Sequence, residues 1–157
     1  MTTPARKLDG ARGTTTELPP KLAELVDDFA GVGVKDRLQL LLELSQELPE
    51  LPERYAGHRD AMEQVPECQT PLFLAVEVDP EQTVHLFFDA PAEAPTTRGF
   101  ASIMYTGLDG ESVDTVLGVP NDFYLALGLG EAVSPLRLRG MAAMLARIKN
   151  KVRRTAG

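Results

Sequence analysis

The sequence is short of the residues that build metal centres and disulfides. Its 157 residues include one cysteine, Cys68, two histidines, His58 and His85, and no tryptophan. A single cysteine excludes an internal disulfide, and it excludes a cysteine-cluster zinc or iron–sulfur site within one chain. Two histidines are too few for a convincing histidine metal site. We therefore expect no metal and no cofactor on this chain.

Long hydrophobic runs are also missing. No apolar run reaches the roughly 18 residues that a membrane helix needs, and the N-terminus has no apolar stretch of the secretory type. We therefore expect a cytoplasmic protein without membrane contact, in a compartment that keeps thiols reduced. A chain of 157 residues with 43% hydrophobic residues has enough apolar side chains for the core of one ordinary domain.

Basic residues are in the minority and unevenly spread. The formal net charge of −7 argues against general nucleic-acid binding. Residues 137–154 nevertheless contain seven basic residues and no acidic ones, which leaves nine basic residues against all 23 acidic ones elsewhere, a net charge of −14. This asymmetry indicates a basic face for a partner. The alternative is a solvated helix with cations near its C-terminus, where the helix dipole favours them.

Threonine, proline and leucine predict a tail followed by two helices. Residues 1–18 are rich in threonine and are expected to form a disordered tail, which leaves residues 19–157 as a single domain. Pro20 suits a first helical position, and apolar residues at helical spacing predict helices over about 20–29 and 35–48. The second helix is expected to carry a wide apolar face, made of Leu38, Leu41, Leu42, Leu44 and Leu48.

The centre of the chain predicts β-structure, and the remainder predicts helices. Residues 72–78 and 82–88 are expected to be strands joined by a turn at 79–81, with a short strand near 62–65. Further helices are expected at 96–106 and at 111–117, the latter capped by Asp109 or Gly110. Two more helices are expected to begin after caps at Asn121 and Ser134. A small antiparallel sheet of about three strands packed against several helices is an α+β fold.

Cys68 lies in a segment that is typical of a functional thiol. It sits in Val65-Pro66-Glu67-Cys68-Gln69-Thr70-Pro71, among polar neighbours and between two prolines. Functional groups concentrate in loops held by rigid elements, although position alone leaves a structural role for Cys68 open. No basic residue is adjacent, and Glu67 would tend to raise the thiol pKa, so a protease-type nucleophile is poorly supported. A sulfur acceptor needs less: access, some thiolate and a good leaving group on the donor.

Four sequence blocks resemble the SufE family of sulfur acceptors. They occur in the family's order and together span about residues 22–152. The blocks are the leucine-rich segment 42–52 with its Leu-Pro ending, Val65 to Leu74 around the cysteine, Glu93 to Phe100, and Ser134 to Met141. The sequence departs from the family at Glu67, where glycine is usual, at Thr70, where serine is usual, and at Phe73, where tryptophan is usual. With these three residues the segment is similar to that of actinobacterial members of the family.

The resemblance implies a function and a set of site residues. Cys68 would accept persulfide sulfur from a SufS-type cysteine desulfurase, stimulate that enzyme, and pass the sulfur to a SufBCD-type scaffold for iron–sulfur cluster assembly. Pyridoxal phosphate would belong to the desulfurase, and this chain would be a sulfur-transfer partner and not an independent enzyme. The residues implied to bind the partner or support the cysteine loop are Arg137, Glu93, Arg98, Gly99, Gly140, Glu67 and Gln69.

Two alternatives stay open at this level. A thiol-based redox regulator would use Cys68 for a mixed disulfide or a sulfenic acid, and it would need a low thiol pKa. A binding module would use the basic last helix, and Cys68 would be incidental. Arg137 bears on the choice, because the first turn of a helix does not favour a cation, which hints at a role outside the helix itself.

Overall fold

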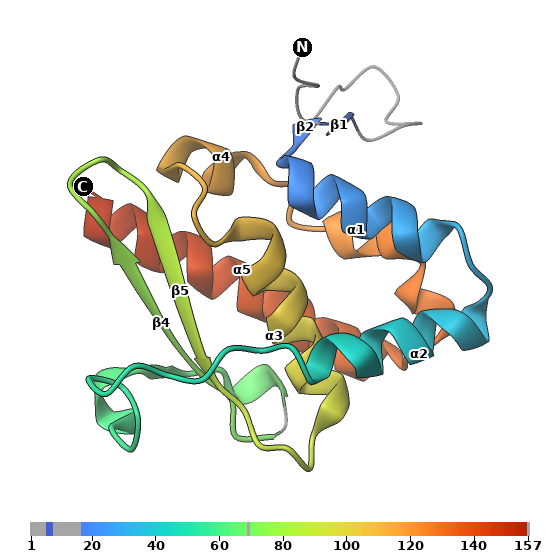
Figure 1. The fold of residues 1–157 in the computed structure, drawn as a ribbon, viewed down its shortest axis with the longest axis horizontal. Helices are drawn as coiled ribbons and strands as arrows, with labels where there is room; N and C mark the ends of the chain where they lie inside the picture. The colour runs from blue at the N-terminus through green and yellow to red at the C-terminus, as the bar shows by residue number, and fades with distance from the viewer. Residues whose placement is uncertain (1–5, 8–16, 69, 157) are drawn as a thin grey trace.

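The computed structural model describes residues 6–7, 17–68 and 70–156, and it has the predicted α+β class (Figure 1). The helices are α1 (Pro20–Ala30), α2 (Val34–Ser45), α3 (Pro95–Leu108), α4 (Val113–Gly118) and α5 (Pro135–Ala156). Strands β3 (Glu63–Gln64), β4 (Phe73–Val78) and β5 (Val84–Asp89) form an antiparallel sheet in the order β3-β4-β5. Strands β1 (Arg6–Lys7) and β2 (Glu17–Leu18) form a separate pair, and short 3-10 helices occur at η1 (Arg59–Ala61), η2 (Pro66–Cys68), η3 (Phe123–Leu127) and η4 (Leu129–Glu131).

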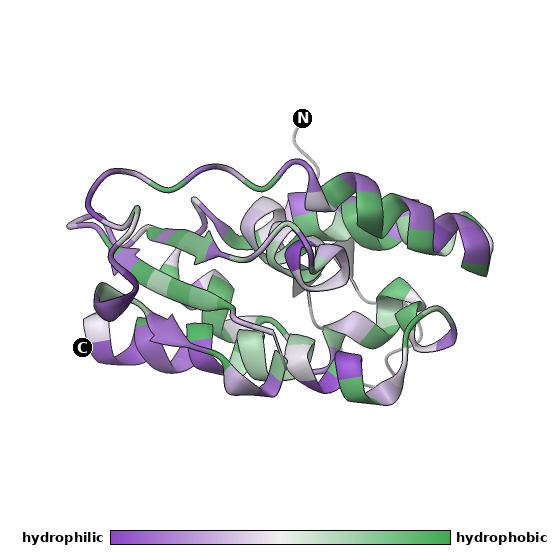
Figure 2. Ribbon diagram, turned by 90° about the horizontal axis from the view of Figure 1, so that it is seen from below, coloured by the Kyte–Doolittle hydropathy of each residue, from purple (hydrophilic) through white to green (hydrophobic). Residues whose placement is uncertain are grey.

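Helix α3 lies at the centre of the packing. It contacts α1, α2, α5 and β5, and the helices carry separate hydrophobic and hydrophilic stripes (Figure 2). Two glycines allow the close approach of neighbouring helices. A Cβ on Gly99 would lie 2.6 Å from the backbone oxygen of Leu41 in α2, and a Cβ on Gly107 would lie 2.7 Å from Cδ1 of Leu22 in α1. Real side chains do not pack this closely. At Gly99 the obstacle is a backbone oxygen, so the α2–α3 spacing requires glycine, whereas at Gly107 an added Cβ would require the Leu22 side chain to shift.

The β4–β5 hairpin packs on the helical core through α3 and α5. Strand β5 alternates as a half-buried strand should, with Val84, Leu86 and Phe88 buried and the residues between them partly exposed. The predicted turn is confirmed, since the Asp79 carboxylate accepts the backbone N–H groups of Glu81 and Thr83 at 2.9 and 3.0 Å. Helix α5 runs along β4 (Figure 1), so the hairpin and the last helix enclose apolar side chains between them.

Helix α2 is shorter and more exposed than its leucines predict. It ends at Ser45, whose hydroxyl donates to a carbonyl one turn earlier at 2.5 Å. The predicted end at Leu48 is wrong, because Pro49 disfavours helical backbone at the residue before it. Leu48 is nevertheless buried, in the extended connection that follows. Of the predicted leucine face, Leu41 is fully buried but Leu38 is 38% exposed, so the face is narrower than expected.

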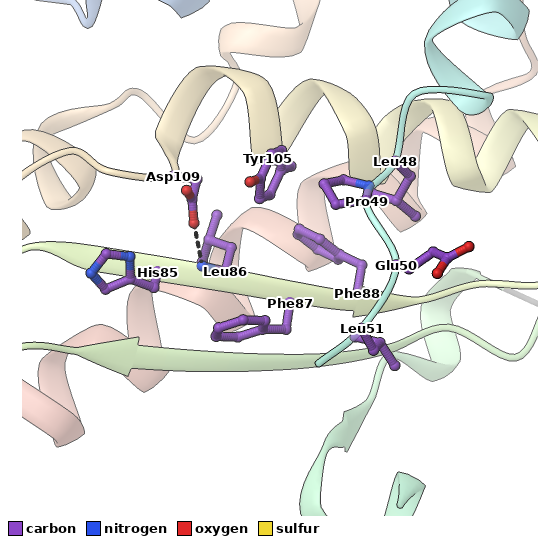
Figure 3. Close-up of a pocket in the computed structure, with 10 residues that line it drawn as sticks. All are labelled: Leu48, Pro49, Glu50, Leu51, His85, Leu86, Phe87, Phe88, Tyr105 and Asp109. Carbon is purple, nitrogen blue, oxygen red and sulfur yellow. Dashed lines mark hydrogen bonds between the residues drawn. The ribbon is translucent and has the colours of Figure 1, made fainter. Parts of the chain in front are cut away.

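The predicted caps of helix α4 are wrong, because another residue takes that role. Ser112 caps α4 by accepting a backbone N–H at 3.1 Å, and neither Asp109 nor Gly110 does so. Asp109 instead accepts the backbone N–H of Leu86 at 2.7 Å, on the outer edge of β5 (Figure 3). This contact lies in a pocket of about 230 Å³ between residues 48–51, β5 and α3. A long-range hydrogen bond to the sheet has therefore displaced the local capping role.

The predicted tail contributes to the core at its end. Residues 1–5 and 8–16 lie outside the described residues. Strand β1 pairs with β2, and Leu18 is 2% exposed and belongs to the hydrophobic core, although it falls within the range assigned to the tail. Within the described ranges, no helix combines the length and the apolar character that crossing a membrane requires.

Candidate functional site

Cys68 lies in the connection between strands β3 and β4. At the base of this connection the Val65 N–H donates to the Leu72 carbonyl at 2.8 Å, and the Cys68 N–H donates to the Val65 carbonyl at 3.1 Å within η2. The antiparallel pairing of β3 with β4 therefore holds both ends of a short loop, residues 66–71, which we call the cysteine loop. Gln69 of the predicted site lies outside the described residues.

The Cys68 thiol faces helix α5. Its Sγ–H donates to the Gly140 carbonyl at 3.6 Å, and the side chain is partly buried. A Cβ on Gly140 would lie 3.1 Å from Cys68 Cα and 3.2 Å from its Sγ. These contacts are tighter than an ordinary side chain makes, so glycine at position 140 permits the cysteine loop to lie directly on the helix.

Burial raises the pKa of Cys68 from its ordinary value of 9.0 to about 12. Loss of solvation is the main cause, the neighbouring Glu67 carboxylate adds to it, and the Arg147 guanidinium opposes it. A pKa of about 12 leaves a thiolate fraction near 10⁻⁵ at neutral pH. Because the thiolate is the nucleophile, Cys68 is a poor nucleophile in this conformation.

We expect the alkylation of Cys68 by iodoacetamide to rise about tenfold with each pH unit from about pH 7 to pH 10. The raised pKa means that the thiolate fraction keeps growing through this range, whereas a thiol with a pKa of 9.0 would approach a plateau. Intact mass spectrometry at a series of pH values measures the rate, and the same chain in denaturant is the control. A rate in the folded chain that levels off between pH 9 and pH 10, as it would for a pKa of 9.0, would contradict the sheltered thiol.

Arg147 of helix α5 binds two carboxylates, one of which belongs to Glu67, the residue before the thiol. Its Nε and Nη2 donate to Glu67 at 3.0–3.2 Å, and its Nη1 donates to Glu63 of β3 at 2.5 Å. Lys151 and Arg154 add ion pairs to Glu63 at 3.6 and 4.0 Å. The hydrogen bonds from Arg147 hold the pKa of Glu67 below its usual value. Sequence reasoning missed Arg147 as a site residue, although the acid-free basic stretch contained the signal.

The other end of the cysteine loop contacts helix α3. The Thr70 hydroxyl donates to the Thr97 hydroxyl at 3.1 Å, and Thr97 is 4% exposed in the first turn of α3. Two helices therefore contact the cysteine loop, α5 through Cys68 and Glu67, and α3 through Thr70.

An open hollow of about 350 Å³ lies beside the thiol. Its lining residues are Cys68, Thr70, Ser134, Leu136 and Arg137. Leu136 is 44% exposed, and Arg137 is exposed with no ion pair to any side chain in the described part of the chain. The predicted cap of α5 is confirmed, since Ser134 Oγ accepts the Arg137 N–H at 3.3 Å. The thiol thus borders a hollow whose rim carries one exposed leucine and one exposed cation.

Three other predicted site residues lie outside this hollow. Arg98 donates to the Ser45 carbonyl at 3.1 Å and to the Ala90 carbonyl at 2.6 Å, so it joins the end of α2 and the segment after β5 to α3. Gly99 provides the close α2–α3 contact described above. Glu93 is exposed in the turn before α3, and it makes no ion pair within the described ranges. Arg98 and Gly99 therefore support the fold beneath the cysteine loop.

The cations of residues 137–154 do not form one free basic face. Three of them pair with the carboxylates of β3 and η2. Lys149 is 6% exposed, and its ammonium donates to a backbone carbonyl and to Asn121 Oδ1, the latter at 2.8 Å; burial lowers its pKa. Asn121 therefore binds this lysine, and its predicted role as a helix cap is wrong. Arg137 is exposed at the hollow that contains the thiol, and Arg139 is exposed two residues further along α5.

The fold and the site together define a small α+β protein with one partly buried thiol on the cysteine loop between β3 and β4. Among the residues that the structure describes, no cluster of three or more histidine, cysteine, aspartate or glutamate side chains is arranged to hold a metal ion. Comparison with known proteins places this chain in a family.

The model of the family described as "SufE: Fe-S metabolism associated domain" matches residues 23–152. An uncharacterized SufE-like protein of Mycobacterium tuberculosis is 59% identical over 136 residues, which cover 87% of this chain and 94% of that protein. The "SufE-like protein 1, chloroplastic/mitochondrial" of Arabidopsis thaliana is 29% identical over 136 residues, covering 86% of this chain and 35% of that protein. The solution structure of a hypothetical protein from Thermus thermophilus is 40% identical, with a TM-score of 0.78 over 88% of this chain and 98% of that one.

This chain belongs to the SufE family, whose domain is associated with Fe–S metabolism. The resemblance of the four sequence blocks is thereby confirmed. The likeness to the Thermus structure also agrees with the α+β fold.

Proposed function

We propose that this protein is a sulfur acceptor and carrier for iron–sulfur cluster assembly. Cys68 takes persulfide sulfur from a SufS-type cysteine desulfurase, stimulates that enzyme, and passes the sulfur to a SufBCD-type scaffold. The observation that carries the proposal is the placement of the single thiol, which is partly buried on the cysteine loop and lies beside an open hollow. Membership of the SufE family supports it.

The proposed transfer is an exchange between two thiols and needs no oxidant. The Cys68 thiolate attacks the terminal sulfur of the donor persulfide, the donor's S–S bond breaks, and a new S–S bond forms on Cys68. The donor leaves as a thiolate and takes up the proton that Cys68 lost. The atoms therefore balance as one thiol and one persulfide on each side. Pyridoxal phosphate belongs to the desulfurase, and the residues of this chain act without a cofactor.

The sheltered thiol makes the proposed reaction depend on the partner. In the free protein Cys68 is neutral and donates to the Gly140 carbonyl. A docked desulfurase has to draw the cysteine loop away from α5 or place a base beside the thiol. In return, a persulfide kept against the protein is protected from stray thiols and oxidants. The same raised pKa argues against a redox regulator, because a peroxide-sensing thiol needs a lowered pKa and exposure.

The rim of the hollow supplies the proposed docking contacts. Leu136 is among the large apolar side chains that remain exposed, and it lies within the hollow that also contains Cys68. Arg137 is exposed beside it in the first helical turn, where the helix dipole disfavours a cation. A partner surface with an apolar side chain and a carboxylate would satisfy both residues. This arrangement would bring the donor persulfide to the side of the molecule where the thiol lies.

Intact mass spectrometry tests the proposed function. After incubation with a SufS-type desulfurase, cysteine and pyridoxal phosphate, this chain is expected to gain one or more sulfur atoms, about 32 Da each, which dithiothreitol removes. Cys68→Ser, treated in the same way, is expected to keep its own mass. A wild-type chain that stays unmodified beside an active desulfurase would contradict the proposal.

A further inference from the structure

One face of helix α5 contacts two neighbouring residues of the cysteine loop. The Gly140 carbonyl accepts a hydrogen bond from the Cys68 thiol. Arg147 binds the carboxylate of Glu67, which immediately precedes Cys68 in the sequence. Gly140 and Arg147 are about two turns apart on α5, so they lie on the same face of the helix. The loop is thus attached to α5 through its thiol and through the adjacent carboxylate.

The Glu67–Arg147 contact has the geometry of a strong ion pair. Nε and Nη2 of Arg147 both donate to the Glu67 carboxylate, at distances of 3.0–3.2 Å. Glu63 binds the remaining Nη1 from strand β3, so the guanidinium is already oriented when it meets Glu67. The Arg147 side chain is 27% exposed and that of Glu67 is 44% exposed, which leaves the pair within reach of a docking partner.

We infer that Arg147 is a positioning residue for sulfur transfer: by holding Glu67 it keeps the cysteine loop seated on α5, and this ion pair opens before Cys68 reaches a donor persulfide. The inference rests on the proposed function. Glycine, which the SufE family usually has before the cysteine, offers no side chain for this contact. The ion pair is therefore a consequence of the departure at Glu67, and it adds a charge-dependent hold on the thiol.

The ion pair affects Cys68 in two ways that substitutions separate. Through space, Glu67 disfavours the thiolate and Arg147 favours it. Electrostatics alone therefore predicts that losing Glu67 speeds alkylation of Cys68 and that losing Arg147 slows it. If the ion pair instead acts by keeping the cysteine loop seated on α5, either substitution removes that ion pair, and both substitutions speed alkylation. The sign of the Arg147 effect decides between the two.

The experiment measures the alkylation rate of Cys68 by iodoacetamide in the free full-length chain at one pH. The variants are Glu67→Gln, Arg147→Gln and their combination. Arg153→Gln is the matched control, because it removes one positive charge from the same helix and its guanidinium donates to Asn150 at 3.1 Å, away from the loop.

Each single substitution in the pair is expected to speed alkylation about three- to fivefold, the range for releasing a well-formed partly exposed ion pair. The double variant is expected to be no faster than Glu67→Gln, because both changes act through one contact. Arg153→Gln is expected to match the wild type. An Arg147→Gln rate that is unchanged or slower overturns the inference, and so do single effects that multiply in the double variant.

Failure of this inference is distinguishable from failure of the proposed function, because alkylation involves no desulfurase. If the wild type gains sulfur but Arg147→Gln alkylates no faster, the carrier function stands and the positioning role falls. If the variants alkylate faster but the wild type gains no sulfur, the loop contact stands and the carrier function falls.

Discussion

Replacing Cys68 by serine is expected to abolish the stimulation of a SufS-type desulfurase and to leave the fold intact. Serine has nearly the shape of cysteine, and its hydroxyl is able to donate to the Gly140 carbonyl in place of the thiol. The free energy of unfolding should therefore change by about 1 kcal/mol or less. Oxygen at this position cannot take up persulfide sulfur by thiol exchange, so cysteine turnover should fall to that of the desulfurase alone.

The serine variant also separates the sulfur acceptor from a binding module. Circular dichroism and thermal unfolding establish that the variant is folded, and a binding assay establishes that it still docks. A folded, docked variant without stimulation is the result that the proposal requires. Stimulation equal to that of the wild type would show that docking alone activates the desulfurase, and the thiol would then be incidental.

Gly99→Ala is expected to destabilise the protein by about 2 kcal/mol, through overpacking between α2 and α3. The added methyl group would lie 2.6 Å from the backbone oxygen of Leu41 and 2.7 Å from its Cδ1. A backbone atom within a helix does not move aside as a flexible side chain would, so the two helices have to separate. Urea unfolding measures the effect as a lower midpoint with an unchanged slope.

Gly118→Ala is the matched control for this prediction. Gly118 is also helical, in α4, but nothing lies within 4 Å of the Cβ that the substitution would add. Its expected effect is neutral or stabilising by up to about 1 kcal/mol, because alanine reduces the conformational freedom of the unfolded chain. Equal midpoints for the two variants would show that the α2–α3 spacing does not depend on glycine at position 99.

Local chemistry made much of the secondary structure predictable. Pro20 and Ser134 start their helices as expected, and the alternation of β5 and the turn at Asp79 lie where the sequence places them. Each of these signals depends on a few neighbouring residues, so no knowledge of the fold is needed. The four blocks, in the order typical of the family, then identified that family and picked out Cys68 as the candidate thiol.

Local signals failed where a distant group supplied a better partner. The Asp109 carboxylate accepts an N–H of β5, and Asn121 accepts a hydrogen bond from the Lys149 ammonium, so neither side chain caps the N-terminus of the helix that follows it. Arg98 was predicted to bind the partner or to support the cysteine loop, and its hydrogen bonds join the end of α2 and the segment after β5 to α3, which the sequence did not show. In each case packing brings the backbone or side-chain partner close, and the spacing of residues along the sequence does not predict such a contact.

The sequence by itself determined the α+β class, the single thiol, and the tendency of Glu67 to raise the pKa of that thiol. Only the tertiary structure decided that burial is the larger cause of the shift, that the Gly140 carbonyl accepts a hydrogen bond from the thiol, and that Arg147 binds Glu67 of the cysteine loop. The physical reason is distance along the chain. Desolvation and ion pairing depend on which surfaces meet in space, and α5 meets the cysteine loop only when the whole domain has packed.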